Sequence, residues 1–344
     1  MLQGTWTALL TPFTEDDMVD IEGLKKNVNF QIEQGVTGVL AVGTSGESPT
    51  LSWEEHNKVI ETVVSVAKGR CGVMAGTGSN STKEATQNSK HADDLGVVGC
   101  LLVDCYYNGP SSSELRDEYY AQIAKNIKCE AIPYIIPGRS GTELQSEDLV
   151  LLKKMCPNIR TVKDATGNIE GLKKKRKLLG SDFSILSGDD DLNYKIITDP
   201  EIRGNGVISV TSNICPNAMS QMVKHAFMDE PKGKEIADKL SPLCNVVTVK
   251  AYNERVMPDL SCAVVMDKYR NPLPYKVMMK VLGMPSGNPR KPLGKMSLKG
   301  LNVLREALRL TYTNSSEFLT PINDFYGVDV KMRIEDDNIW NSLL

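Results

Sequence analysis

Ile159-Arg-Thr-Val-Lys-Asp-Ala-Thr-Gly-Asn168 is the stretch that decides how this sequence folds. A short β-branched run over residues 159–162 leads to Lys163, and a polar turn follows before a charged helical pattern begins at Ile169. This order predicts a lysine at the carboxyl end of a buried strand. Because burial disfavours the ammonium form, such a lysine tends to become an amine nucleophile that forms Schiff bases with carbonyl substrates. A surface lysine beside a polar turn is the simpler interpretation, so other stretches must support the first.

Short apolar runs alternate with longer amphipathic ones from Gly4 onward. Eight such units fill about 225 residues at a spacing of about 30, which predicts a (β/α)8 TIM barrel. The runs are almost entirely apolar, as in parallel sheets covered on both faces. A doubly wound sheet is the alternative, but Thr11-Pro-Phe-Thr14 is not the Gly-rich turn it requires. The expected strands are Thr5–Leu10, Gly38–Val42, Gly72–Ala75, Gly99–Val103, Ala131–Ile136, Ile159–Val162, Phe183–Leu186 and Gly206–Val210.

The pattern divides the chain into three parts. Residues 1–228 are expected to form the catalytic barrel and residues 229–311 a C-terminal helical domain. Residues 312–344 form a C-terminal extension that is too apolar for a disordered tail, so we expect it to pack on the body or on a neighbouring subunit. The helices expected after the barrel are Gly233–Val249, Ser261–Lys268, Tyr275–Leu282 and Ser297–Thr311.

Composition narrows the class of protein. The 344 residues are 41% hydrophobic and 24% charged with a net charge of -3, which is typical of a globular enzyme and gives no electrostatic reason to expect nucleic acid or membrane. No apolar run approaches a membrane span, and the amino terminus lacks signal-peptide features, so we expect a cytoplasmic protein. Eight scattered cysteines and three histidines show no zinc-ligand spacing, and no metal is expected. One nucleophilic cysteine stays possible.

Active sites of βα barrels lie at the carboxyl ends of the strands. After the second expected strand, two glycines in Gly43-Thr-Ser-Gly-Glu-Ser48 allow a tight turn. Its N–H groups and the hydroxyls of Thr44 and Ser45 can converge on a small anion such as a carboxylate. Gly76-Thr-Gly-Ser-Asn80 imitates a dinucleotide fingerprint but lacks its last glycine, so no nucleotide is expected there.

Three further strand ends carry polar groups. Tyr106-Tyr107 and Tyr134 suit the proton transfers of imine chemistry, although either alone would more often be a core residue. Arg139 offers a planar fork for a second carboxylate, unless it is simply a surface residue. The run 186–191, Leu-Ser-Gly-Asp-Asp-Asp, is interpreted as a turn with a helix N-cap rather than as a metal cluster, because imine chemistry needs no Lewis acid.

The turn at residues 43–47, the Tyr134-x-x-Pro-x-Arg-x-Gly141 segment and Val162-Lys-Asp-Ala-Thr-Gly-Asn168 together resemble the dihydrodipicolinate synthase/N-acetylneuraminate lyase family of pyruvate-dependent class I aldolases. The resemblance covers residues 1 to about 310. It implies that Lys163 forms an imine with pyruvate, that no other cofactor is needed, and that Thr44 and Ser45 bind the pyruvate carboxylate. By the same resemblance the proton relay consists of Tyr134, Thr44 and Tyr107, with the last supplied by the neighbouring subunit of a tight dimer. Gly188 and Ile208 match pocket-lining backbone positions.

Arg139 favours the synthase branch of this family. Its match there binds the carboxylate of L-aspartate-4-semialdehyde, which would place the protein in lysine biosynthesis. Two alternatives stay open, namely a related aldolase or hydratase for another 2-oxo acid and a barrel that binds such acids without turnover. Asp104-Cys105 stands where Thr-Pro is usual, and Ile135 replaces a frequent asparagine, so the fine specificity can differ.

The resemblance also implies a homodimer or homotetramer that L-lysine inhibits at a separate interface site. A carboxylate there can pair with the α-ammonium, polar groups can bond the zwitterion, and an indole can cover the aliphatic stem. The competing interpretation is that the tryptophan and the histidine merely pack at the start of a helix. The residues that match the allosteric lysine site are Ser48, Trp53, His56, Asn80, Glu84 and Tyr106.

Overall fold

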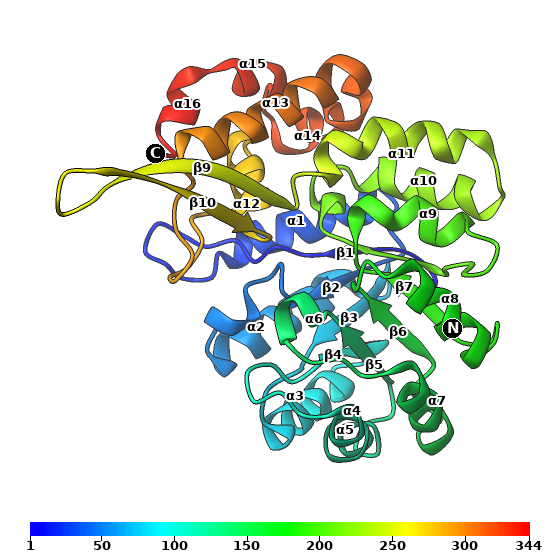
Figure 1. Ribbon diagram of the computed structural model, residues 1–344. Coiled ribbons are helices and arrows are strands. Elements are labelled where there is room, and N and C mark those ends of the chain that lie inside the picture. The colour runs from blue at the N-terminus through cyan, green and yellow to red at the C-terminus, as the bar shows by residue number, and fades with distance from the viewer.

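Eight parallel strands close into a barrel in the computed structural model, which describes residues 1–344 (Figure 1). The predicted TIM barrel is therefore confirmed, and every strand end lies within two residues of its expected position. The ring closes where β1 pairs with β8 and Gly4 faces Gly206. A Cβ on Gly206 would lie 2.1 Å from the Gly4 carbonyl oxygen, so closure requires glycine. The strands are β1 Gly4–Ala8, β2 Gly38–Ala41, β3 Gly72–Gly76, β4 Gly99–Val103, β5 Glu130–Ile135, β6 Thr161–Asp164, β7 Ser184–Ser187 and β8 Gly206–Ser209.

Helices cover the outside of the barrel, as the amphipathic stretches predicted. A capping box between Ser52 and Glu55 fixes the start of α2. The helical segment after β4 is composite, with a π-helical turn at Leu115–Tyr120 between α4 and α5. The barrel helices are α1 Ile21–Glu33, α2 Trp53–Ala67, α3 Thr82–Asp94, α4 Ser112–Glu114, α5 Ala121–Ala124, α6 Pro137–Ser140, α7 Ser146–Met155, α8 Ile169–Leu179, α9 Asn193–Thr198 and α10 Pro216–Phe227.

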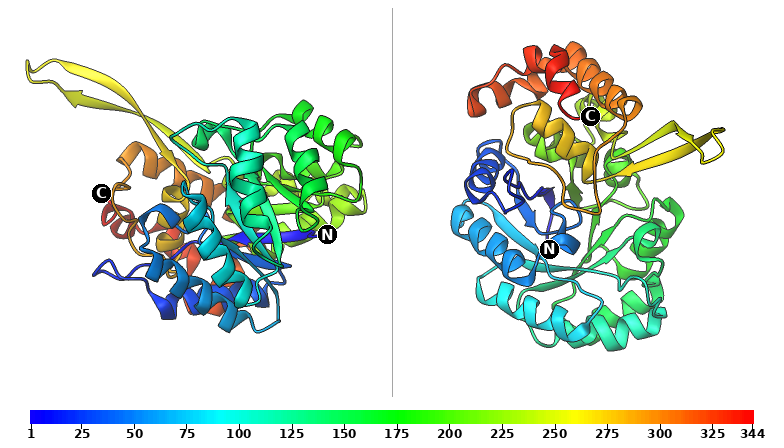
Figure 2. Two further views of the ribbon diagram at one scale, coloured as in Figure 1. Left: turned by 90° about the horizontal axis from the view of Figure 1, so that it is seen from below. Right: turned by 90° about the vertical axis from the view of Figure 1, so that its left-hand side faces the viewer.

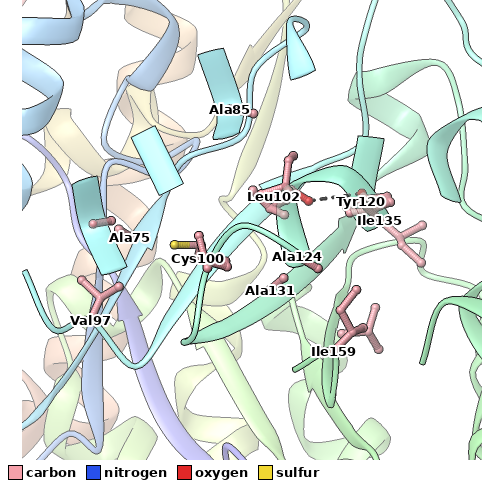
Figure 3. Close-up of a cluster of buried hydrophobic side chains, with 14 of the residues drawn as sticks. Ala75, Ala85, Val97, Cys100, Leu102, Tyr120, Ala124, Ala131, Ile135 and Ile159 are labelled. Carbon is pink, nitrogen blue, oxygen red and sulfur yellow. Dashed lines mark hydrogen bonds between the residues drawn. The ribbon is translucent and has the colours of Figure 1, made fainter. Parts of the chain in front are cut away.

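Apolar side chains fill both sides of the strands. Figure 3 shows part of the outer layer, where Cys100 and Leu102 of β4 and Ile135 of β5 lie under the helices. Tyr120 belongs to this layer and donates its hydroxyl to the Leu102 carbonyl oxygen over 3.2 Å. The barrel interior is filled by a separate cluster of nine buried residues. That cluster includes Tyr134, so the inner packing positions a residue of the predicted site.

A β-hairpin follows α11 and projects from the body (Figures 1 and 2). The helix predicted over Ser261–Lys268 is therefore wrong, and the one over Gly233–Val249 is too long, because α11 ends at Cys244. Asp259 accepts hydrogen bonds from the N–H and hydroxyl of Ser261, which forms the tight turn between the strands. The C-terminal elements are α11 Pro231–Cys244, β9 Thr248–Val256, β10 Cys262–Arg270, α12 Leu273–Val281, α13 Leu298–Ser315, α14 Thr320–Tyr326, α15 Val330–Glu335 and α16 Asp337–Asn341.

The C-terminal extension packs on the body, one of the two places expected for it. Phe325 and Tyr326 of α14 each lie 5.2 Å from the ring centroid of Phe30 on α1. The Tyr326 hydroxyl also donates to Asn27 over 2.9 Å, and Trp340 is buried in the same cluster. None of the helices combines the length and hydropathy needed to span a membrane.

Candidate active site

Lys163 and Tyr134 lie side by side inside the barrel. They are register partners on β6 and β5, and the Lys163 Nζ lies 4.1 Å from the centroid of the Tyr134 ring. Lys163 is only 5% exposed. Desolvation lowers its pKa to about 8, while the charges of Asp190 and Asp189 offset part of this effect. A buried lysine with a lowered pKa is what the strand-end position predicted, and a substantial fraction of its amine is unprotonated a little above neutral pH, as imine chemistry requires.

A cavity of about 70 Å³ adjoins the lysine, which is room for a few water molecules or a small organic acid. Gly188 and Ile208 line it, as the family resemblance implied. A Cβ on Gly188 would lie 2.9 Å from the Lys163 Cε, so a larger residue would displace the lysine stem. The side chain of Ile208 belongs to the inner apolar cluster and closes the cavity from β8.

The turn after β2 brings Thr44 and Ser45 to the same cavity. The main-chain N–H groups of both residues have no acceptor within the chain, so they are free to bind an anion. The turn is fixed by Glu47, whose backbone is left-handed with φ 57°. Its buried carboxylate lies 2.5 Å from the Lys276 Nζ and accepts from the Arg290 N–H over 2.9 Å. A buried ion pair between Glu47 and Lys276 thus fixes the turn that is predicted to bind a carboxylate.

Tyr134 is a proton donor at neutral pH. Burial raises its pKa to about 12, against lowering contributions from Arg139 and from contact with the Thr44 side chain. A phenol that keeps its proton and also touches a hydroxyl can pass a proton without becoming a strong base or acid. The structure therefore places two of the three expected relay residues, Tyr134 and Thr44, next to the nucleophile.

Tyr107 does not reach this cavity. Its side chain is 95% exposed, and its backbone has φ 76°, which is unusual for a residue other than glycine. The loop after β4 therefore holds the ring in solvent, away from Lys163 of the same chain. A contribution of Tyr107 to a relay requires a second subunit, as the resemblance implied.

Arg139 stands on the short helix α6, directly beyond β5. It lines an outer pocket of about 230 Å³ together with Thr44 and Tyr134, so the outer and inner cavities share two residues. Arg139 reaches solvent at the pocket mouth, yet the surrounding protein lowers its pKa by desolvation. Its Nη2 donates to the Asn271 carbonyl oxygen over 2.9 Å. It forms no ion pair, which leaves its fork available for an anion.

The three aspartates after β7 do not cap a helix, contrary to the interpretation of this run. Asp189 makes no capping bond and instead accepts from the Gly167 N–H over 3.0 Å. One oxygen of Asp190 accepts from the N–H groups of Val210 and Thr211. These carboxylates therefore tie the loops after β6 and β8 to the loop after β7.

The six residues that match a lysine site lie near the turns after β2, β3 and β4. Trp53 and His56 are in edge contact at 4.9 Å, and Asn80 accepts from the Tyr106 N–H over 2.8 Å. Ser48 and Tyr106 line the outer pocket together, and Glu84 accepts from the Ser79 hydroxyl nearby. Burial lowers the pKa of His56 to about 4, so its imidazole is neutral.

Two site features were missed from the sequence. Asn271, just before α12, lines the inner cavity and donates from Nδ2 to the Ser45 hydroxyl over 3.0 Å. The only signal was the Asn-Pro-Leu-Pro turn, which does not indicate a site. Lys175, which no sequence pattern singled out, is buried and lies 3.0 Å from Asp164, the residue after Lys163.

Known proteins are similar to this chain in both sequence and architecture. A 4-hydroxy-tetrahydrodipicolinate synthase of Methanococcus maripaludis is 40% identical over 308 residues, which are 89% of this chain and 98% of the relative. A dihydrodipicolinate synthase from Acinetobacter baumannii, solved with pyruvate, matches with a TM-score of 0.80 and 35% identity over 90% of this chain and 99% of its own. One from Cyanidioschyzon merolae, solved with lysine bound, gives a TM-score of 0.80 and 32% identity over 90% and 98%. Residues 1–310 match the family model, and the chain belongs to the dihydrodipicolinate synthetase family.

Proposed function

We propose that this protein is a 4-hydroxy-tetrahydrodipicolinate synthase, which condenses pyruvate with L-aspartate-4-semialdehyde in lysine biosynthesis. The observation that carries the proposal is the buried Lys163 amine beside the Tyr134 phenol, at the end of a small cavity with free N–H groups. These are the groups that an imine-forming enzyme needs for a 2-oxo acid. The synthase relatives and the pyruvate-bound neighbour support the same substrate.

The reaction follows from the positions of these groups. The Lys163 amine adds to the C2 carbonyl of pyruvate to give a carbinolamine, while the carboxylate is held by the Thr44 and Ser45 N–H groups. Tyr134 donates a proton to the departing hydroxyl, so that water leaves and the imine forms. Loss of a methyl proton gives an enamine, whose C3 then bonds to the aldehyde carbon of the second substrate. The amino group of the condensed acceptor then displaces the lysine nitrogen from C2, which closes the ring, releases the product and restores the amine. The water lost on imine formation is the only by-product, and no step calls for a metal or an organic cofactor.

Arg139 supports an acceptor that carries a carboxylate. It stands at the mouth of the outer pocket without an acidic partner, where its fork would hold the acceptor while the aldehyde points toward Lys163. Lysine, the end product of the pathway, would bind at the turns after β2, β3 and β4. The lysine-bound relative supports a site for this effector.

A coupled assay tests the proposal. Purified protein with pyruvate should consume L-aspartate-4-semialdehyde and form the cyclic product, whereas pyruvate with other aldehydes should give far lower rates. Equal rates with N-acetylmannosamine or another neutral aldehyde would favour a related aldolase. Tight pyruvate binding without any turnover would favour a binding protein.

A further inference from the structure

The base of the β9–β10 hairpin adds positive charge to the mouth of the active site. A groove of about 500 Å³ begins at Thr44 and Arg139 and continues along the last residues of β10. The basic residues that line it are Arg139, Lys268, Arg270 and Lys295. The groove has one acidic lining residue, Glu47, and that carboxylate is already paired with Lys276. The groove therefore carries an uncompensated positive charge next to the proposed acceptor pocket.

Arg139 and Arg270 hold one another's loops by crossed hydrogen bonds. Arg139 donates to the carbonyl oxygen of Asn271, the neighbour of Arg270, over 2.9 Å. Arg270 donates to the carbonyl oxygen of Gly138, the neighbour of Arg139, over 3.1 Å. The two guanidinium groups are close enough that the charge of Arg270 helps to lower the pKa of Arg139. Each uses one of its five N–H donors in these bonds, and neither meets a carboxylate.

Lys268 is a third cation of the groove that has no acidic partner. It lies directly across the hairpin from Lys250, and both are exposed. Like charges directly opposite one another destabilise a two-stranded sheet. Lys295 differs, because it donates to the Leu344 carbonyl oxygen. Three cations thus face the groove without an acid, which is costly in the free protein and favourable when a carboxylate enters.

We propose that Arg270 joins Arg139 in a two-arginine site for the carboxylate of the acceptor substrate, so that selectivity for anionic acceptors depends on the hairpin as well as on α6. The identity of the ligand rests on the proposed function. The site itself rests on the crossed arginine contacts and on the groove. The second arginine would strengthen binding of the acceptor without touching the pyruvate imine, because Arg270 lines the outer groove and not the cavity at Lys163.

Calorimetric titration with succinate tests this site without requiring turnover. Succinate is an unreactive four-carbon dianion, and it would be titrated into the free enzyme and into enzyme reduced with borohydride in the presence of pyruvate. Arg270→Gln should bind succinate about ten-fold more weakly than the wild type, as expected for one lost charge-assisted contact. Glutamine keeps a donor for the Gly138 carbonyl, so the variant removes the charge and leaves the loop contact available. Arg270→Lys should recover part of the loss.

Two controls separate this role from a structural one. Lys250→Gln removes the same charge from the same hairpin, at a residue that does not line the groove, and should change succinate binding less than two-fold. Succinamide has the same skeleton without charge, and it should bind wild type and Arg270→Gln equally. Unchanged succinate binding in Arg270→Gln, or an equal loss in Lys250→Gln, would overturn the inference. Arg270-dependent succinate binding in an enzyme that makes no product would instead leave the site standing and reject the proposed function.

Discussion

Lys163 and Tyr134 are register partners on adjacent strands, and the lysine nitrogen lies 4.1 Å from the centre of the phenol ring. The ring covers one side of the lysine, which contributes to the desolvation that lowers the lysine pKa to about 8. The same burial raises the pKa of the phenol to about 12. The same enclosure therefore brings the lysine pKa close to neutral pH, so that a usable fraction of the amine is unprotonated, and keeps the phenol protonated.

We predict that borohydride with pyruvate traps one adduct per chain, at Lys163, and that the trapping rate rises with pH through an inflection near 8. The amine must be unprotonated to attack, and with a pKa of about 8 about one-tenth of it is unprotonated at pH 7, against far less for an exposed lysine with a pKa near 10.4. Peptide mapping and the pH dependence of trapping measure this. Lys163→Ala should trap nothing. An adduct at Lys276, whose pKa is also lowered to about 8, would contradict the assignment.

How far the sequence predicted the fold depended on burial. The barrel strands are covered on both faces, so their apolar runs marked them clearly, and the turns after them carried the site residues. The hairpin is exposed on both faces, so Val264, Val265 and Met266 follow no buried period and were interpreted as a helix. The Pro258-Asp259 turn was the available signal for a hairpin. Asn271 and Arg270 were missed because they reach the site only through this hairpin.

Arg139→Ala should impair use of the semialdehyde and leave pyruvate trapping at Lys163 intact. The arginine lines the outer pocket and not the cavity around the lysine, so its loss should act mainly on the acceptor; the charge of Arg139 also contributes to the lowered pKa of Lys163, so the inflection of trapping should move slightly upward. Loss of a bidentate contact should cost about 2–4 kcal/mol of transition-state stabilisation, which appears as a lower kcat/KM for the semialdehyde. Steady-state kinetics with each substrate varied separately would show this. An unchanged kcat/KM for the semialdehyde would mean that Arg139 is only a surface residue.

Lys276→Met should destabilise the protein by about 3–5 kcal/mol, because it leaves the Glu47 carboxylate buried without its partner. Lys234→Met is the matched control. Its ammonium also lies 2.5 Å from a carboxylate, that of Asp238, but the pair is exposed and should contribute less than about 1 kcal/mol. Denaturant unfolding of both variants measures the difference. Equal stability of the two would show that the turn after β2 does not depend on the buried pair.

Tyr107→Phe should slow catalysis, and mixing it with Lys163→Ala should restore partial activity. The tyrosine is exposed and does not line the cavity of its own chain, so we expect it to act in the site of a partner subunit. A mixed dimer would contain one site with both an intact lysine and an intact tyrosine. Activity is measured after subunit exchange has been verified with labelled chains. No recovery under those conditions would exclude Tyr107 from the relay.

Lysine inhibition can be predicted from the turns after β2, β3 and β4. The imidazole of His56 is neutral, because burial lowers its pKa to about 4, and both ring nitrogens are buried without a hydrogen-bond partner behind Trp53. Trp53 is half-exposed against it and can cover an aliphatic stem. Glu84 keeps one carboxylate oxygen free, since its only side-chain contact is to the Ser79 hydroxyl. Glu84 therefore offers an exposed carboxylate for one ammonium group of a diamino acid, and Trp53 offers an apolar surface beside it for the stem.

Titration of initial rates with L-lysine checks this site. Millimolar lysine should inhibit the wild type, and Glu84→Ala should need roughly ten-fold more because an ammonium loses its charged partner. Glu61→Ala is a suitable control, since Glu61 is an acid on the neighbouring helix α2 that pairs with His91 rather than with these residues. Lysine should inhibit Glu61→Ala at the same concentrations as it inhibits the wild type. No inhibition of the wild type would reject the site, and equal inhibition of Glu84→Ala would move it away from Glu84.

Because Ser48 and Tyr106 also line the outer pocket with Arg139, bound lysine should raise the KM for the semialdehyde more than the KM for pyruvate.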